Sequence, residues 1–253
     1  LFDLSGKVAV VTGSSRGIGR AIVERIAEQG AKVVVSSRKA GPCEEVAAAI
    51  NAKHGAGTAI AIPANISSKD DLRRLADETT KTFGKIDILV CNAASNPYYG
   101  PLAEIADDQF RKILDNNIIS NNWLISFVAP QMRARKDGAI VIVSSIGGLK
   151  GNDIIGAYNI SKAADFQLAR NLAVEFGRDN VRVNCIAPGL IKTDFAKALW
   201  DNPETLKAST ARTPLKRIGM PDEIAGAAIF LASAAGTYMT GQSVVVDGGA
   251  TIT

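Results

Sequence analysis

Thr12-Gly13-Ser14-Ser15-Arg16-Gly17-Ile18-Gly19 follows the β-branched run Val8 to Val11 and opens a helical pattern that begins at Gly17. Glycine lets the backbone approach a diphosphate group closely, and the first N–H groups of a helix point toward such an anion. The stretch therefore predicts a strand, a turn and a helix that bind the phosphates of a dinucleotide. An ordinary tight turn is the competing interpretation, and other parts of the chain must decide between the two.

Short β-branched runs alternate with longer helical patterns through the rest of the chain. The further predicted strands are 32–36, 58–62, 86–91, 139–144, 181–186 and 244–246, and the predicted helices begin near residues 17, 44, 69, 107, 158 and 221. This alternation is typical of βα units wound into a parallel sheet. We expect one α/β domain over residues 1–253, a Rossmann fold with a doubly wound parallel sheet and helices on both faces. Residues 190–217 lack strand character and predict a helical lid.

One predicted helix has well-marked bounds. Ser67 or Ser68 can cap the helix from Lys69, Asp71 can complete a capping box with Ser68, and Gly84 is placed to end the helix. The next helix is expected to run from about Asp107 to Arg135.

Length and composition fit one large domain. The chain has 253 residues, of which 47% are hydrophobic, enough for one sizeable core. The formal net charge is +4 and the charges are scattered, so a basic cofactor pocket explains the excess better than nucleic acid does. No apolar stretch approaches the roughly 18 residues of a membrane span, and the start lacks a signal pattern. We expect a cytoplasmic protein that binds neither nucleic acid nor a membrane.

Cysteine and histidine are scarce. The three cysteines, Cys43, Cys91 and Cys185, are odd in number and widely separated, which predicts reduced thiols and not a disulfide framework. The one histidine, His54, lies at an expected helix end, where a solvated side chain is a better interpretation than a metal ligand. We expect no metal site.

Tyr158-Asn159-Ile160-Ser161-Lys162 places a tyrosine and a lysine four residues apart, on one face of a helix. An ammonium beside a phenol favours its ionised form, which matters because free tyrosine titrates near pKa ~10 and is a poor proton shuttle at neutral pH. An isolated pair would be better read as a packed aromatic and a surface charge. Ser145, thirteen residues earlier, and the glycine stretch favour a nucleotide-dependent carbonyl/alcohol redox site instead.

These residues resemble the short-chain dehydrogenase/reductase family from about Leu4 to Gly249. The family pattern recurs at Asn92-Ala93-Ala94, Asn117, Ser144-Ser145, Asn184, Pro188-Gly189 and Thr193. Within the family, residues 36–39, 96–100 and 183–193 are most similar to NADPH-dependent carbonyl reductases of the dehydrogenase/reductase member 4 type.

The resemblance implies four catalytic residues: Asn117, Ser145, Tyr158 and Lys162. Tyr158 would donate its proton to the carbonyl oxygen, or accept it in the oxidative direction, and Ser145 would hold that oxygen. Lys162 would lower the tyrosine pKa and bind the nicotinamide ribose, and Asn117 would hold a water that links Lys162 to solvent. A purely structural polar face shared with Asn121 is the alternative for Asn117.

Residues after the second predicted strand favour NADP(H) over NAD(H). A site that prefers NAD usually has an acid there, but this chain has Ser36-Ser37-Arg38-Lys39. Arg38 can pair with a 2′-phosphate, Ser37 can donate to it, and Arg16 lies within plausible reach. The alternative is that Arg38 and Lys39 are solvated loop charges.

The cofactor contacts implied by the resemblance are spread over six segments. They are Gly13, Ser15, Arg16, Gly17, Ile18, Gly19, Ser37, Arg38, Lys39, Asn65, Ile66, Asn92, Ala93, Tyr158, Lys162, Pro188, Gly189, Ile191 and Thr193. Asn65 departs from the aspartate that commonly meets the adenine, although its amide oxygen can still accept. Ala94 replaces a common glycine and adds a methyl group where the backbone approaches the cofactor.

Apolar and aromatic residues flank the predicted site: Tyr98 and Tyr99 after the fourth strand, and Phe195, Leu199 and Trp200 in the predicted lid. Such a lining suits bulky or aromatic ketones; the alternative is that the lid residues only anchor the lid. The second candidate is a 3-oxoacyl-thioester reductase, whose acidic carrier could meet Arg133, Arg135, Lys136 and Arg178. A nonenzymatic NADPH-binding sensor is the third.

The predicted helices 107–135 and 158–176 carry more apolar surface than one sheet face needs, as at Ile118, Trp123, Phe127, Phe166 and Leu172. The family resemblance implies that these helices pair across a twofold axis in a homotetramer.

Overall fold

The structure is a computed structural model, and it describes residues 1–211 and 213–253. Within them, seven strands form one parallel sheet in the order β3-β2-β1-β4-β5-β6-β7. The strands are β1 (Val8–Thr12), β2 (Lys32–Ser36), β3 (Ala59–Ala61), β4 (Ile88–Cys91), β5 (Gly138–Val143), β6 (Val181–Pro188) and β7 (Ser243–Val246). The order reverses beside β1, as a doubly wound sheet requires. The predicted fold class is confirmed.

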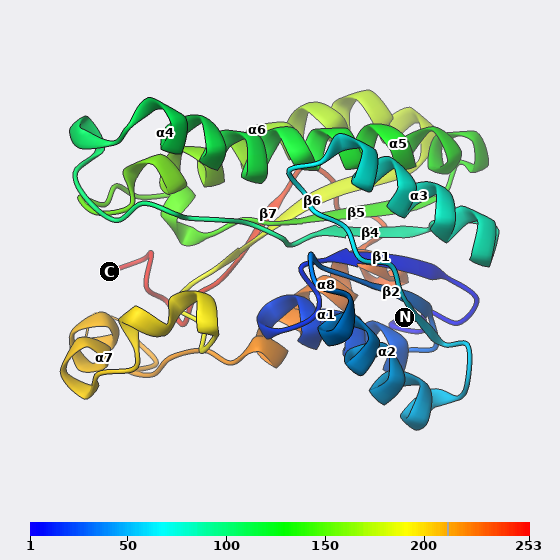
Figure 1. Cartoon of the computed structure of the whole chain (residues 1–253), viewed down its shortest axis with the longest axis horizontal. Helices are drawn as coiled ribbons and strands as arrows, with labels where there is room; N and C mark the ends of the chain where they lie inside the picture. Colours follow the sequence, from blue (N-terminus) through cyan, green and yellow to red (C-terminus); the bar gives the residue numbers. More distant parts are fainter. Residues whose placement is uncertain (212) are drawn as a thin grey trace.

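Helices cover both faces of this sheet (Figure 1). The helices α3 (Lys69–Phe83), α4 (Asp107–Leu114), α5 (Ser120–Arg135) and α6 (Gly156–Phe176) lie on one side, and α1 (Gly17–Glu28), α2 (Ala40–His54) and α8 (Pro221–Ala232) lie on the other. The short helix α7 (Pro203–Thr210) lies at the same end of the molecule as the loop between β4 and α4 (Figure 1).

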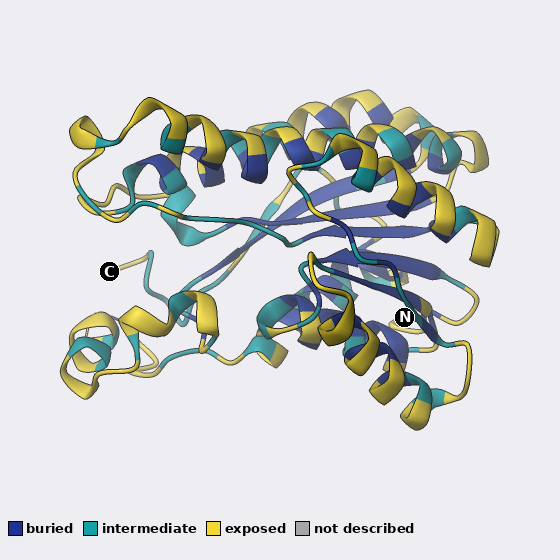
Figure 2. Ribbon diagram, viewed as in Figure 1, coloured by how far each residue is buried: buried dark blue, intermediate teal, exposed yellow. Residues whose placement is uncertain are grey.

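The sheet is buried on both faces because its strands are nearly continuous β-branched runs (Figure 2). Alternate residues enter separate cores: Val11 and Val33 pack with α1, α2 and α8, whereas Val10 and Val34 pack with α3, α5 and α6. The rigid sheet fixes the loops at its carboxyl edge.

The third helix begins and ends where its sequence signals predict, with one correction. The hydroxyl of Ser68 accepts from the N–H of Asp71 at 3.1 Å, and Gly84 has a left-handed φ of 81°. The expected capping box is wrong, because the Asp71 carboxylate accepts instead from the N–H of Asn65, at 2.8 Å. Asp71 thus fixes the loop after β3.

The long helix predicted from Asp107 to Arg135 is interrupted. Residues Asp115–Ile119 form a π-helical segment between α4 and α5. A π-helical segment contains one extra residue per turn and often occurs at functional sites. It carries Asn116 and Asn117, both buried.

The predicted lid contains a 3₁₀ helix at Asp194–Leu199 and the helix α7, while residue 212 lies outside the described residues. The three cysteines are buried thiols with no disulfide among them. In the part of the chain that the structure describes, no helix is long and apolar enough to cross a membrane.

Candidate active site

The predicted site residues gather at the carboxyl edge of the sheet. The glycine stretch follows β1, Asn92 and Ala93 follow β4, and Ser145 follows β5. Ligands of open α/β sheets bind at this edge. The fold therefore brings together segments that are far apart in the sequence.

The glycine stretch is held in place by residues after β4. Asn92 donates through Nδ2 to the carbonyl oxygens of Thr12, at 2.9 Å, and Gly13, at 3.2 Å. The hydroxyl of Thr12 accepts from the N–H groups of Asn92 and Ala93, at 3.0 and 3.1 Å. A Cβ atom on Gly19 would collide with Asn92 and with the carbonyl of Gly13. The loop is therefore rigid and closely packed.

The start of α1 is suited to an anion. Gly13 and Gly17 have positive φ values of 66° and 57°, which glycine adopts without strain. Arg16 precedes the helix, and no side chain among the described residues caps it, so its first N–H groups can meet phosphate oxygens. Ser15 is half-buried at the turn, and Ile18 packs against the core below α1.

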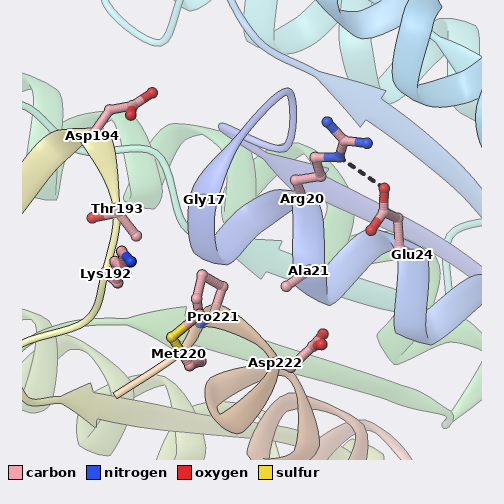
Figure 3. A pocket seen from close by; sticks show the side chains of 10 residues that line it. All are labelled: Gly17, Arg20, Ala21, Glu24, Lys192, Thr193, Asp194, Met220, Pro221 and Asp222. Carbon is pink, nitrogen blue, oxygen red and sulfur yellow. Dashed lines mark hydrogen bonds and ion pairs between the residues drawn. The ribbon is translucent and has the colours of Figure 1, made fainter. Parts of the chain in front are cut away.

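A cavity of about 360 Å³ lies beside this turn, between α1 and the start of α8 (Figure 3). Its lining includes Gly17 and Thr193, together with Arg20, Ala21, Glu24, Lys192, Asp194, Met220, Pro221 and Asp222. None of the four predicted catalytic residues lines it, so it adjoins the phosphate end and not the reacting end.

The cofactor residues predicted after β2 and β3 lie next to each other. Arg38 and Lys39 are exposed, and the hydroxyl of Ser37 is 3.0 Å from the thiol of Cys43. The carbonyl of Ser37 accepts from the N–H of Ala64, which brings Asn65 and Ile66 beside this turn. The amide oxygen of Asn65 already accepts from the N–H of Ser67, at 3.2 Å, and retains one lone pair for a ligand. Arg16 does not join this group in the structure, because it pairs with Asp194 at 3.5 Å.

Tyr158, Lys162 and Ser145 form the reacting end. The Nζ atom of Lys162 is 5.7 Å from the centroid of the Tyr158 ring. It donates to the carbonyl oxygen of Val143 at 3.0 Å and to the carboxylate of Asp165 at 3.1 Å. The hydroxyl of Ser145 hydrogen-bonds with Tyr158 and also accepts from the N–H of Gly147, at 3.0 Å.

Burial dominates the electrostatics of the phenol. It raises the pKa of Tyr158 above its ordinary value, while Lys162 and the hydrogen bond with Ser145 act in the opposite direction without cancelling it. Lys162 therefore lowers the Tyr158 pKa as expected, but the net shift is upward. Burial is the largest single influence on Lys162 and would lower its pKa, but Asp165, Tyr158 and Cys185 together outweigh burial, so the Lys162 pKa is raised.

Asn117 lies in the π-helical segment and links the loop after β4 to α6. Its Nδ2 donates to the carbonyl of Ser95 and to the hydroxyl of Ser161, each at 3.0 Å, and its Oδ1 accepts from the N–H of Ser95 at 2.8 Å. Its carbonyl accepts from Asn121, at 2.7 Å. These bonds give Asn117 a structural role next to the site, in line with the alternative of a shared polar face; its predicted water-holding role stays a prediction.

The segment after β6 passes close to both ends of the site. Pro188 ends β6, the N–H of Gly189 donates to Val246 at 3.0 Å, and Ile191 is buried. Thr193 lies beside Gly17, and its carbonyl accepts from the indole N–H of Trp200 at 2.9 Å. Trp200 thus braces the predicted lid internally; that the lid residues only anchor the lid to the body stays a prediction.

Sequence reasoning missed three residues that shape the site: Asp165, Ser161 and Thr12. Thr12 and Ser161 hydrogen-bond to the predicted site residues Asn92 and Asn117. Asp165 is three residues after Lys162, a spacing that places both on one helix face and that the sequence displays.

Residues 13–251 match a family model described as enoyl-(acyl carrier protein) reductase. Dehydrogenase/reductase SDR family member 4 from Bos taurus is 43% identical and covers 97% of this chain and 88% of its own length. The counterpart from Caenorhabditis elegans is 37% identical, over 96% of this chain and 95% of that protein.

Two solved structures are closely similar. One is a putative NAD(P)-dependent gluconate 5-dehydrogenase from Beutenbergia cavernae with NADP bound at low occupancy; it is 35% identical, has a TM-score of 0.93, and covers 100% of this chain and 99% of its own. The other is a 7α-hydroxysteroid dehydrogenase complexed with NADH and 7-oxo glycochenodeoxycholic acid. It is 38% identical, with a TM-score of 0.93, over 98% of this chain and 95% of its own.

Proposed function

The chain belongs to the short-chain dehydrogenase/reductase family of oxidoreductases, and we propose that it reduces ketones or aldehydes to alcohols with NADP(H), with Tyr158 as general acid/base. The observation that carries the proposal is the reacting end, where the Tyr158 phenol hydrogen-bonds with Ser145 and the buried Lys162 ammonium lies 5.7 Å from the centroid of its ring.

The residues of the site fit a dinucleotide. The uncapped start of α1 and the glycines that a Cβ atom would crowd form a cradle for a diphosphate. The diphosphate would contact Gly13, Ser15, Gly17, Ile18 and Gly19, and the adenine would contact Asn65 and Ile66. The nicotinamide half would contact residues that follow β4 and β5 and residues from the end of β6 onward: Asn92, Ala93, Tyr158, Lys162, Pro188, Gly189, Ile191 and Thr193. The bound cofactor would supply the hydride.

The side chains of the protein would bind the carbonyl oxygen and transfer a proton to it. Hydride transfer places negative charge on the carbonyl oxygen, which needs a hydrogen-bond donor and a proton. Ser145 would hold that oxygen and Tyr158 would protonate it. The raised pKa of Tyr158 keeps the phenol protonated at neutral pH, as a proton donor must be. Lys162 would stabilise the phenolate that remains, and Asn117 would hold a water for its reprotonation.

The preference for NADP(H) rests on the residues after β2. Ser37, Arg38 and Lys39 offer no acid to repel a 2′-phosphate, and the two basic side chains are exposed at that turn. The gluconate 5-dehydrogenase with bound NADP is in line with this preference, whereas the 7α-hydroxysteroid dehydrogenase was crystallised with NADH. Arg16 would have to leave Asp194 to reach the phosphate.

Bulky or aromatic carbonyls are the proposed substrates. Tyr99 and Phe195 are 56% and 48% exposed, and Phe195 lies beside Tyr158. The N–H of Gly100 donates to Ile154 at 2.8 Å, which ties the loop that carries Tyr98 and Tyr99 to the segment before α6. An apolar rim of this kind suits an apolar ligand.

The 3-oxoacyl-thioester reductase is the second candidate. The description of the matching family model names the same kind of carrier but a different reacting group, an enoyl group and not a 3-oxo group. The basic residues expected to meet a carrier do not support it. Arg133 pairs with Asp179 and Glu175, Arg135 donates to Ile86, and Lys136 precedes β5 at the sheet edge opposite the site. The complete Asn117, Ser145, Tyr158 and Lys162 set weighs against a nonenzymatic sensor.

The test compares NADPH and NADH oxidation with aromatic ketones, α-dicarbonyls and an acetoacetyl thioester. Tyr158→Phe should lower kcat by about 10²–10⁴-fold and leave NADPH binding intact, while Tyr238→Phe, at a fully exposed tyrosine, should change neither. Turnover of the thioester alone would favour the second candidate. Retained turnover in Tyr158→Phe would reject the mechanism.

A homotetramer and a cytoplasmic location stay predictions. Two of the residues expected to form the tetramer interface already have partners: Lys69 lies over the Trp123 ring at 5.7 Å, and Arg73 lies over the Phe127 ring at 4.2 Å. Light scattering at micromolar concentration tests the assembly.

A further inference from the structure

Asp165 is a buried carboxylate beside the reacting end to which the proposed mechanism gives no role. It lies one turn after Lys162 on α6, is 0% exposed, and its Oδ2 is 3.1 Å from Lys162 Nζ. The amide of Asn121, on α5, donates to its Oδ1 at 3.3 Å. Burial of a charged pair is unfavourable unless other interactions offset it. A polar pair in this position therefore points to a role in the chemistry.

The contacts of Lys162 show what Asp165 does. Both acceptors of the Lys162 ammonium, the Asp165 carboxylate and the Val143 carbonyl, lie in the buried interior. The ammonium stays 5.7 Å from the centroid of the Tyr158 ring, a distance at which it acts through its field. Together, a carboxylate, an ammonium and a neutral phenol carry no net charge. Without the carboxylate the group would carry one positive charge.

Other titratable groups face this cluster from neighbouring elements. Cys91 on β4 and Cys185 on β6 interact with Asp165, and Arg170 on α6 interacts with Cys185. Burial raises the pKa of both thiols far above the ordinary value, so both stay neutral. Tyr99, from the loop after β4, contributes to the raised pKa of Tyr158. Burial also raises the pKa of Asp165, against the Lys162 ammonium and the hydrogen bonds with Lys162, Asn121 and Ser144. The negative charge that faces the Lys162 ammonium is that of Asp165.

We propose that Asp165 is a positioning residue: its carboxylate, 3.1 Å from Lys162 Nζ, holds the ammonium in the buried interior and balances its charge. The Tyr158–Lys162 pair should then release its first proton at a higher pH than it would without Asp165. This inference rests on the proposed function of Tyr158 and Lys162. Its consequence is a shift in the pH dependence of the rates. Alcohol oxidation needs the ionised phenol as a base, so Asp165 would move the rise of the oxidation rate to higher pH.

The direct test is a titration that needs no turnover. Tyrosinate absorbance is followed against pH, and the curve of the matching Tyr158→Phe variant is subtracted. In parallel, the carbon NMR signal of Lys162, assigned with Lys162→Met, is followed over the same range. Both probes are needed because interacting groups titrate as a pair. Asp165→Asn should lower the first apparent pKa of the pair by about one unit, as removal of a nearby unit charge predicts.

Asp87→Asn is the matched control. Asp87 is also buried and paired, with Lys85 at 3.0 Å and Arg135 at 3.4 Å, but it lies just before β4, at the opposite edge of the sheet. It should lose stability and leave the titration unchanged. Asp165→Ser, smaller and equally uncharged, serves as the second variant if Asp165→Asn does not fold. An unshifted titration in the folded Asp165 variant would overturn the proposal.

Kinetics separate this inference from the proposed function. In Asp165→Asn, the pH at which alcohol oxidation reaches half its maximum rate should fall with the titration, by about one unit. If the wild type shows no carbonyl turnover but the titration shifts, the proposed activity is wrong and the electrostatic role of Asp165 stands. If the wild type is active and neither curve shifts, Asp165 is structural only.

Discussion

The ring of Phe195 lies 6.0 Å from the ring of Tyr158, measured between centroids, with the two planes tilted by 43°. This pair joins the predicted lid to α6. Because Phe195 is also half-exposed, it can contact both the predicted proton donor and a ligand above it.

Phe195→Ala should therefore weaken the binding of bulky aromatic ketones. We expect about a tenfold rise in KM for them, which corresponds to the loss of one aromatic contact, and little change for small aliphatic ketones. Phe2→Ala is the control, since Phe2 is 49% exposed and lies near the N-terminus. Equal effects of Phe195→Ala on large and small ketones would contradict a substrate wall at this position.

Arg38→Asp should reverse the cofactor preference. A carboxylate at this turn would repel a 2′-phosphate and accept from a ribose hydroxyl instead. We expect kcat/KM for NADPH to fall at least tenfold relative to that for NADH. Arg178→Asp makes the same charge change at an exposed residue before β6 and should leave the ratio unchanged. If NADPH remains preferred in Arg38→Asp, the assignment of Arg38 fails.

Gly19→Ala should disrupt the predicted cofactor loop. The added methyl group would collide with Asn92 and the carbonyl of Gly13, and both are held by hydrogen bonds. We expect at least a tenfold loss of NADPH affinity in a calorimetric titration. Gly226→Ala, inside α8, is the control, because its Cβ would meet no atom within 4 Å. It should be neutral or raise stability by about 0.5–1 kcal/mol.

Glu223 should make stability depend on pH in the acid range. Its carboxylate accepts from both terminal nitrogens of Arg217, at 2.6 and 2.7 Å, and from the N–H of Met220, at 2.8 Å. These bonds lower the Glu223 pKa from 4.5 to about 2. A lowered folded-state pKa means that the contribution is complete above pH 4.5 and disappears as the pH falls through about 2. The difference in Tm between wild type and Glu223→Gln should therefore be largest near neutral pH and shrink as the pH approaches 3. A difference that is independent of pH would contradict this.

The sheet and the Tyr158–Lys162 pair proposed as catalytic could be predicted because local patterns specify them. The β-branched runs give the strands, and the strand ends bring Thr12, Asn92 and Ser145 to one edge without further information. The π-helical turn at Asn117 could not be predicted, because an extra residue in a helical turn depends on tertiary contacts, here with Ser95 and Ser161. For the same reason the sequence did not show that Asp71 would turn toward Asn65.

Side-chain partners were the least predictable part. Arg16 is drawn to Asp194, nearly 180 residues away in the chain, and the net shift of the Tyr158 pKa depends on burial that only packing creates. The sequence shows that Lys162 and Asp165 are three residues apart, but it does not show that both side chains are buried and form an ion pair.

The indole of Trp200 ties its segment to the carbonyl of Thr193, two residues before Phe195. Thr193 borders the glycine turn and Phe195 borders Tyr158, so one short, internally braced stretch of chain touches both predicted ligand sites. Any ligand that repositions Thr193 must also move Phe195. The affinities for the two ligands are then thermodynamically linked, and each should tighten or weaken the other by the same factor.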